Sequence, residues 1–89
     1  EIEEVLNRHP LVHDCAVIGV PDPARGEVAM AFVEIAEGAS FNERELRAHC
    51  RESLAQFKVP REIRLLEALP RNPTGKIMRR ALSAEATEV

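Results

Sequence analysis

Two consecutive apolar runs, separated by a segment rich in proline and glycine, constrain the fold of this chain more than any other feature. The first run covers residues 11–20 and is apolar apart from His13 and Asp14, so its second half is typical of a strand buried on both faces. The intervening residues 21–26 contain two prolines and one glycine, which favour a long, rigid loop. The second run, residues 27–35, is rich in Val, Met, Phe and Ile and predicts another strand. We therefore expect a β-hairpin.

Four further segments carry signals of regular structure. In chain order they are a short amphipathic helix over residues 2–9, a helix over 40–55, a strand over 62–66 and a final helical turn or two over 77–82. The first helix ends before Pro10, because the residue that precedes a proline disfavours the α conformation. The second is expected to start at Ser40, because Glu43 stands three residues later and the two form a capping box.

This order of elements predicts an α+β fold, in which a small three-stranded sheet, made of the hairpin and a third strand, is packed with helices. The helix between the second and third strands permits a right-handed crossover, and the pattern leaves the direction of the third strand open. At 89 residues the chain is one small domain, near the size at which a single core only just suffices. We place the domain at residues 1–82 and expect a frayed tail over 83–89.

The charge of the chain is unevenly distributed, although its formal net value is only −3. Residues 1–55 carry five Arg against eleven Asp and Glu, whereas residues 56–82 carry seven Lys and Arg against two Glu. A basic third on an acidic domain indicates a local anion site rather than a nucleic-acid surface, and a solvated positive face is the alternative. Three Phe residues without Trp or Tyr also exclude the stacking platforms of single-strand nucleic-acid binders.

Histidine and cysteine show no pattern of a metal site or of a nucleophilic triad. The histidines fall on different expected elements, and Cys15 and Cys50 form no Cys-x-x-Cys pair. We expect both cysteines to be small buried hydrophobes, and nothing in the pattern demands a disulfide. No signal peptide and no run of about 18 apolar residues is present, so a cytoplasmic protein without a membrane span is expected. The chain begins inside a helical pattern without methionine, which we interpret as a piece of a longer protein.

Residues 69–80 concentrate two prolines, a glycine and four cations in twelve positions. Residues 72–75 have the composition of a tight turn, in which the glycine is free to adopt a positive φ. Lys76 follows that turn, and a long-stemmed ammonium on a loop suits a charge that must reach a phosphate or a carboxylate. A phosphate-binding P-loop is excluded, because the positions that require glycine and Ser or Thr hold Pro70 and Ile77. A solvated surface lysine is the alternative.

Three motifs in order resemble the C-terminal domain of the adenylate-forming superfamily, which includes acyl-CoA synthetases, the adenylation domains of peptide synthetases and beetle luciferases. The match runs from residue 1 to about residue 82 with its spacing intact, and residues 1–3 resemble the end of the motif that follows the inter-domain hinge. The family's Gly-x-Pro-Asp…Gly-Glu loop is matched by Gly19, Pro21, Asp22, Gly26 and Glu27. Its last core motif is matched by Pro70, Gly75, Lys76, Ile77 and Arg79.

The resemblance implies the small, mobile domain of a two-step ligase, inactive alone. A large N-terminal domain, its implied partner, would bind ATP with Mg²⁺ and a carboxylic acid, and this domain would close over that site. Lys76 would reach the substrate carboxylate and the α-phosphate during adenylation, with Pro70, Thr74 and Gly75 in the substrate and nucleotide loop. The domain would then rotate and present another face for thioester formation with CoA. Lys76 also resembles the lysine that is acetylated in bacterial acyl-CoA synthetases.

Within the superfamily, residues 57–60 and 71–76 resemble acyl-CoA synthetases more than peptide-synthetase adenylation domains. We therefore expect an AMP-forming acid–CoA ligase, with a role in fatty-acid metabolism. A piece of a peptide synthetase and a stand-alone accessory domain of the same fold are the alternatives. Lys58, Arg79 and Arg80 are candidate contacts for CoA phosphates, and plain surface charge is the alternative for them. The acid pocket would lie in the N-terminal domain, so no particular acid is implied.

Overall fold

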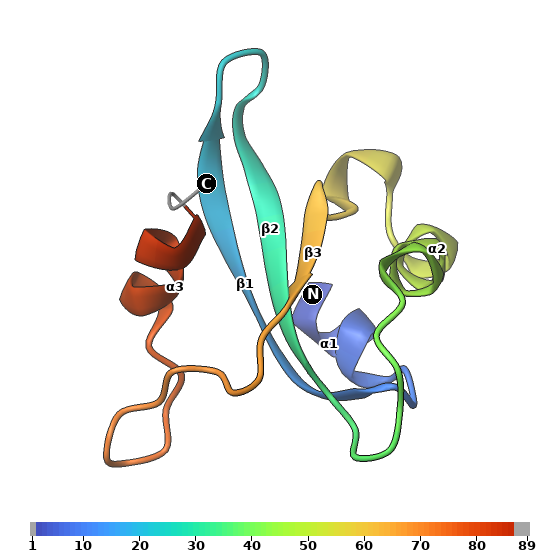
Figure 1. The fold of residues 1–89 in the computed structure, drawn as a ribbon. Coiled ribbons are helices and arrows are strands. Elements are labelled where there is room, and N and C mark those ends of the chain that lie inside the picture. Colours follow the sequence, from blue (N-terminus) through green and yellow to red (C-terminus); the bar gives the residue numbers. More distant parts are fainter. Residues whose placement is uncertain (1, 87–89) are drawn as a thin grey trace.

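The computed structural model describes residues 2–86, except for the side chains of Phe57 and of residues 84–86. In chain order its elements are α1 (Ile2–Asn7), β1 (Val12–Asp22), β2 (Gly26–Ile35), α2 (Glu43–Ser53), the short 3₁₀ helix η1 (Gln56–Lys58), β3 (Glu62–Leu65) and α3 (Arg79–Ala86). The three strands form one sheet in the order β1-β2-β3, with α1 and α2 on one face and α3 on the other (Figure 1). The α+β fold expected from the sequence is confirmed.

The β1–β2 hairpin ends in a tighter turn than the sequence predicts. The two strands pair antiparallel until Asp22 stands opposite Gly26, so the connection spans only residues 23–25 instead of 21–26. The Asp22 side chain explains the difference, because its Oδ2 accepts two backbone N–H groups of the turn, at 3.1 and 2.8 Å. Gly26 leaves the turn with a φ of +82°, a conformation that glycine adopts without strain.

Strand β3 lies parallel to β2, which settles the direction that the sequence pattern leaves open. The pairing runs from Met30 opposite Glu62 to Val33 opposite Leu65. Parallel neighbours cannot be joined by a short turn and need a long crossover, which α2 and η1 provide. Strand β2 is therefore the central strand of the sheet, with β1 and β3 as its neighbours.

Apolar side chains cover both faces of the sheet. The larger core lies against α1 and α2, and its buried members are Val5, Leu6, Val12, Cys15, Ala31, Val33, Leu46, Cys50, Leu54 and Ile63. The smaller core lies against α3, and its buried members are Ala16, Ile18, Met30, Phe32, Leu69 and Leu82. Successive residues of β1 and β2 alternate between the two cores, as side chains of a strand must. The prediction of a strand buried on both faces is confirmed.

Both cysteines are free and buried in the larger core, as the sequence predicts. Burial, together with the negative charges of Glu3 and Asp14, raises the pKa of the Cys15 thiol to about 12. Burial also raises the pKa of Cys50. Both groups therefore stay protonated at neutral pH and pack as small hydrophobic side chains rather than acting as nucleophiles.

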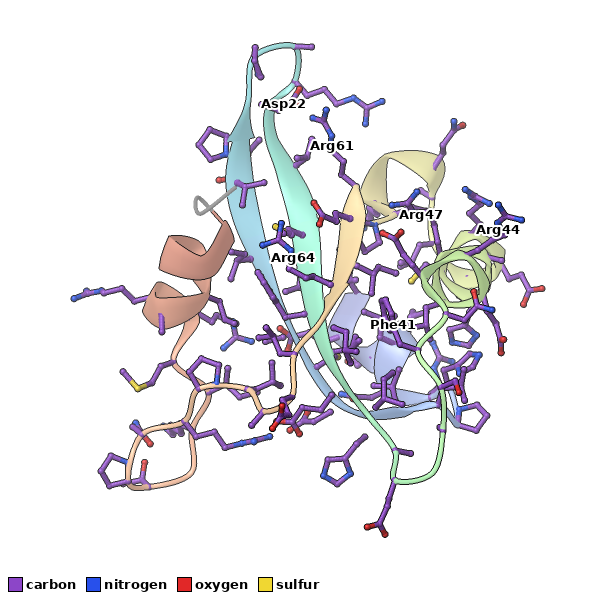
Figure 2. All side chains as sticks on the ribbon, in the orientation of Figure 1. Asp22, Phe41, Arg44, Arg47, Arg61 and Arg64 are labelled. Carbon is purple, nitrogen blue, oxygen red and sulfur yellow. The ribbon has the colours of Figure 1, made fainter. Side chains whose placement is uncertain are left out.

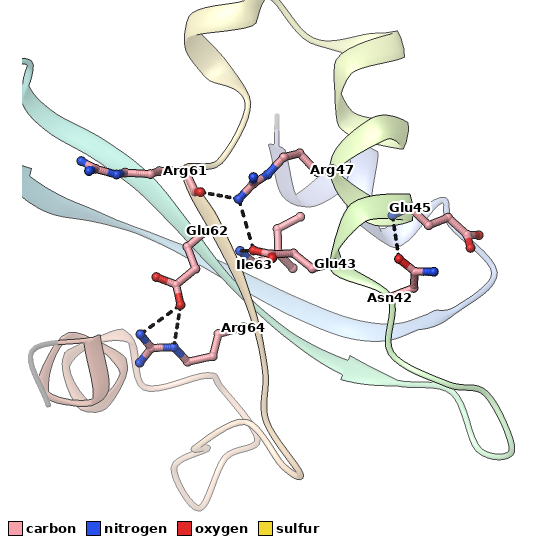
Figure 3. A network of polar contacts seen from close by, with 8 residues as sticks. All are labelled: Asn42, Glu43, Glu45, Arg47, Arg61, Glu62, Ile63 and Arg64. Carbon is pink, nitrogen blue, oxygen red and sulfur yellow. Dashed lines mark hydrogen bonds and ion pairs between the residues drawn. The ribbon is translucent and has the colours of Figure 1, made fainter. Parts of the chain in front are cut away.

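Helix α2 is capped by Asn42 and not, as the sequence suggests, by Ser40. The backbone of Asn42 is extended, and its Oδ1 accepts the N–H of Glu45 at 3.0 Å. Glu43, the other half of the expected capping box, reaches across to β3 instead, where its Oε2 accepts the N–H of Ile63 at 3.0 Å (Figure 3). The capping-box prediction is wrong because the helix begins at Glu43, so Ser40 lies too far before it to act as the cap.

Helix α3 covers residues 79–86, whereas the sequence pattern predicts a helix over 77–82. Ile77 stays outside the helix because its backbone forms an antiparallel bridge with Arg71. The last four residues of α3 are helical although they fall within the expected frayed tail, and residues 87–89 lie outside the described part of the chain. The domain limit itself stays a prediction.

Candidate functional site

The segment around Lys76 folds as a small hairpin, which we call the Lys76 loop (residues 69–78). The N–H of Asn72 donates to the carbonyl of Lys76 at 2.9 Å, and the N–H of Gly75 donates to the carbonyl of Asn72 at 2.9 Å. Gly75 has a φ of +90°, in the left-handed region that three-residue hairpin loops require at this position. The tight turn predicted from the proline and glycine is therefore confirmed.

The side chain of Asn72 holds the tip of the Lys76 loop from within. Its Oδ1 accepts three donors, which are the N–H of Thr74 at 3.0 Å, the hydroxyl of Thr74 at 2.7 Å and the N–H of Lys76 at 3.0 Å. Pro73 contributes a fixed φ at the next position. Hydrogen bonds within the loop thus fix the backbone that carries Lys76. Sequence reasoning missed this role of Asn72, although Asn before a Pro-x-Gly turn is a residue that can accept local N–H groups.

The residue that follows the turn is open to solvent. Lys76 is exposed, and within residues 2–86 no hydrogen bond or ion pair of its ammonium is found. Thr74 and Gly75 beside it are exposed as well, and a Cβ added to Gly75 would meet nothing within 4 Å. Pro70 lies further back in the loop, half-buried, and its carbonyl accepts the N–H of Met78 at 2.7 Å. The loop therefore presents an exposed cation that is accessible to a ligand.

The base of the Lys76 loop is tied to the sheet through Arg71. Its Nη1 lies 3.0 Å from Oε2 of Glu34, and its Nη2 lies 2.5 Å from Oδ2 of Asp14. The same oxygen of Glu34 accepts the N–H of Leu69 at 2.5 Å, and the Leu69 side chain is buried in the smaller core. Hydrogen bonds to Glu34 and to Asp14 raise the pKa of Arg71. Sequence reasoning missed Asp14 and Glu34 as the partners of Arg71. The only sign of them in the sequence is that each of the two apolar strands contains an acidic residue.

The Gly-x-Pro-Asp…Gly-Glu motif forms the far end of the β1–β2 hairpin. The carboxylate of Glu27 lies across Gly19, so a Cβ at Gly19 would stand 2.5 Å from the carboxyl carbon of Glu27 and would displace it. Pro21 and Asp22 are the last residues of β1. Asp22 is buried and forms an ion pair with Arg61, which comes from the segment just before β3 (Figure 2).

Three neighbours, Arg25, Arg61 and Ala24, lower the pKa of Asp22 and so favour its ionised form. The N–H of Arg25 lowers its pKa most, burial acts in the opposite direction, and the guanidinium of Arg61 lowers it further by a hydrogen bond and by its charge. Beside this pair lies a shallow hollow of about 360 Å³, lined by Asp22, Ala24, Arg25, Val28, Ala29, Val59 and Arg61. The motif thus gives the hairpin end a fixed turn and a surface that combines cations with short apolar side chains.

The three candidate cations for CoA phosphates have different surroundings. Nη2 of Arg79 lies 2.6 Å from Oε2 of Glu3, an oxygen that also accepts the N–H of Val17 at 2.8 Å. Arg79 therefore connects α3 to α1 and β1. Lys58 and Glu3 both line a second hollow of about 330 Å³, and Arg80 is exposed at the start of α3. The role of these cations towards CoA stays a prediction.

The Lys76 loop and the turn of the β1–β2 hairpin lie at opposite ends of the molecule (Figure 1). In that view the hairpin turn is at the top, and the loop before α3 is at the bottom left. The structure therefore does not bring the two motifs into one site. They form two separate surfaces, joined by the length of the sheet.

The family model of the AMP-binding enzyme C-terminal domain matches residues 1–76, so the chain belongs to this family. The chain is 47% identical to a sulfoacetate–CoA ligase of Cupriavidus necator, a match that covers 89% of this chain and 16% of that protein. It is 43% identical to a long-chain-fatty-acid–CoA ligase of Bacillus subtilis, covering 99% of this chain and 16% of that protein. The acyl-CoA synthetase of Brucella canis has a similar structure, with a TM-score of 0.89 and 39% identity over 98% of this chain and 17% of that chain.

These matches confirm the resemblance to the small domain of adenylate-forming enzymes. They also show that the chain spans only 16–17% of the length of the three relatives just described. None of the helices within residues 2–86 is both long and apolar enough to cross a membrane.

Proposed function

We propose that this domain is the catalytic lid of an AMP-forming acid–CoA ligase, in which it closes over a nucleotide and acid site built by the rest of the enzyme. One observation carries the proposal: an exposed lysine stands on a loop whose backbone is fixed by its own hydrogen bonds. The relatives support it, because the two compared above are named as CoA ligases. The proposed substrates are ATP, CoA and a carboxylic acid, and the proposed partner is the N-terminal domain.

Lys76 suits the first half-reaction for an electrostatic reason. A carboxylate oxygen attacks the α-phosphorus of ATP, the bond to pyrophosphate breaks, and the acyl-adenylate forms. Because both reactants are anions, a cation between them offsets their repulsion and stabilises the charge that develops on the α-phosphoryl oxygens. Within residues 2–86 no group of three or more His, Cys, Asp or Glu side chains is placed to hold a metal ion, so we assign the Mg²⁺ that accompanies ATP to the rest of the enzyme.

The second half-reaction would use a different surface of the domain. The thiol of CoA attacks the acyl carbon of the adenylate, and AMP leaves. Since the Lys76 loop and the hairpin turn lie at opposite ends of the molecule, a rotation of the domain would withdraw the first and bring other residues to the active site (Figure 1). Lys58, Arg79 and Arg80 are the proposed contacts for the phosphates of CoA.

The acid substrate is not selected by this domain. The chain is 47% identical to a sulfoacetate ligase and 43% identical to a long-chain-fatty-acid ligase. Because these two acids differ greatly while the identities are similar, the sequence of this domain does not depend on which acid is used. A role in fatty-acid metabolism and a cytoplasmic location therefore stay predictions.

The test is acid-dependent ATP–pyrophosphate exchange by the full-length enzyme, measured over a panel of acids. We expect Lys76→Ala to lower exchange by about 10²–10³-fold, the loss typical of a missing contact to developing negative charge. Thioester formation from supplied acyl-adenylate should remain. Arg8→Ala, which removes another exposed cation outside the Lys76 loop and outside the β1–β2 hairpin, serves as the matched control and should leave exchange unchanged. Equal exchange by Lys76→Ala and wild type would instead favour the accessory-domain alternative.

Acetylation of Lys76 is a proposed means of regulation at the same site. It removes the positive charge and the ion-pair donor together while leaving the loop hydrogen bonds in place. We expect enzyme acetylated at Lys76 to lose exchange and to regain it after enzymatic deacetylation. The measurement compares exchange with the stoichiometry of acetylation, determined by mass spectrometry. Full exchange at complete acetylation would exclude this regulation.

A further inference from the structure

Two carboxylates stand directly opposite each other at one end of the hairpin. Asp14 of β1 and Glu34 of β2 are paired in the strand register, on the face of the sheet that bears the smaller core. Like charges at opposite positions of two strands repel each other. Glu34 is also only 7% exposed, and a buried carboxylate without compensation is costly. This arrangement requires a cation at the same place.

Arg71 supplies that cation and contacts both carboxylates at once. One guanidinium nitrogen is bonded to Glu34 and the other to Asp14, at 3.0 and 2.5 Å. Because the guanidinium is a planar fork with fixed donor directions, these two contacts set its orientation as well as its position. We call this set of three side chains the Arg71 clamp.

The backbone of Arg71 is continuous with the loop that carries Lys76. Arg71 forms the antiparallel bridge with Ile77, the residue that follows Lys76, so both arms of the loop meet at the clamp. From that bridge to the tip, the loop is held by the hydrogen bonds of Asn72. The clamp is therefore the point at which a loop that is ordered within itself is joined to the sheet.

We propose that the Arg71 clamp positions Lys76 for adenylation, by fixing the direction in which the Lys76 loop leaves the sheet. This inference rests on the proposed function of Lys76. Arg71 is a positioning residue that acts through the lysine and does not touch the substrates itself. The geometry matters because a displacement of about 1 Å at a reacting centre can cost about 10²-fold in rate.

Packing alone does not supply the same restraint. Leu69 and Leu82 are buried in the smaller core, Ile77 on the other arm of the loop packs against it, and together they keep the segment on the sheet. These apolar contacts are non-directional. They oppose the separation of the loop from the sheet, but they oppose a change in the direction of the exposed loop much less. We therefore expect the domain to stay folded when the clamp is weakened, while the ammonium loses its defined position.

The test uses Arg71→Lys in the full-length enzyme, because lysine keeps the charge but cannot form the fork. We expect the kcat of adenylation to fall by about 10–10²-fold, with smaller changes in the KM for ATP and for the acid. Thioester formation from supplied acyl-adenylate should stay within about twofold of wild type. Arg64→Lys is the matched control, since Arg64 pairs with Glu62 on the same face of the sheet but away from the loop (Figure 3).

A double-mutant cycle separates positioning from plain destabilisation. If Arg71 acts through Lys76, then Arg71→Lys added to Lys76→Ala should lower adenylation no further than Lys76→Ala alone. Independent losses that multiply would overturn the inference, as would an equal fall of both half-reactions or wild-type exchange in folded Arg71→Lys. Loss of exchange in Lys76→Ala together with full exchange in Arg71→Lys would overturn only the positioning role of the Arg71 clamp. Full exchange in Lys76→Ala would overturn the proposed function of Lys76 as well.

Discussion

At the scale of single residues, Asp22 shows how one side chain organises a turn and connects two distant segments. Its carboxylate accepts two N–H groups of the hairpin turn and pairs with Arg61, which lies 39 residues later in the chain. All of these partners favour the ionised carboxylate, so the pKa of Asp22 is lowered from its ordinary value of 3.8. The turn geometry and the attachment of the segment before β3 thus depend on the same charge.

This coupling predicts a specific response to acid. Because the folded pKa of Asp22 lies below the unfolded one, its contribution to stability is present above pH 3.8 and is lost as the pH falls through the folded pKa. We expect Asp22→Asn to lower the thermal midpoint of the chain at neutral pH, and the difference from wild type to shrink below about pH 4. Thermal unfolding monitored by circular dichroism between neutral and strongly acidic pH measures this.

Glu37→Gln is a suitable control, since Glu37 is exposed and lies in the turn after β2. It should follow the wild-type curve at every pH. Curves for Asp22→Asn and wild type that stay parallel down to the lowest pH would show that the charge of Asp22 does not contribute.

At the scale of elements, Glu43 joins the start of α2 to β3. Its Oε2 accepts the N–H of Ile63 at 3.0 Å and a guanidinium N–H of Arg47 at 3.2 Å, and Arg47 also donates to the carbonyl of Arg61 (Figure 3). These bonds reach the edge of a short parallel strand, which has β2 as its only strand neighbour among the described residues. The side chain therefore supplies an acceptor to one N–H of β3 from the helix side.

We expect Glu43→Ala to lower the free energy of unfolding by about 1–2 kcal/mol, because it leaves the Ile63 N–H without its acceptor and removes the ion-pair partner of Arg47. Glu43→Gln, which keeps an acceptor oxygen, should cost less. Urea unfolding measures both, with Glu52→Ala on the exposed side of the same helix as the control. A loss in Glu52→Ala as large as that in Glu43→Ala would attribute the effect to helix propensity or general charge instead.

At the scale of the whole molecule, most elements of the fold follow from local patterns, whereas the direction of β3 and the contacts that hold the site do not. The apolar runs predict β1 and β2, and the proline and glycine around residue 75 predict the turn before Lys76, because both signals lie within a few neighbouring residues. The Arg71–Asp14 contact spans 57 residues and the Glu43–Ile63 contact spans 20. No pattern among neighbouring residues therefore predicts either contact. Glu43, which the sequence assigns to a capping box, thus has its partner in a distant segment.

The length of the hairpin gives the domain the mechanical property of a lever. One end carries the Lys76 loop, attached through Arg71, and the other end carries the turn stabilised by Asp22, with a continuous antiparallel pairing between them. The longest dimension of the domain is 36 Å, so a modest rotation about its middle displaces both ends by several ångströms in opposite directions. In the proposed ligase, one such rotation would withdraw Lys76 from the active site and bring the opposite end of the domain towards it at the same time. The two half-reactions would then exclude each other without a separate regulatory element.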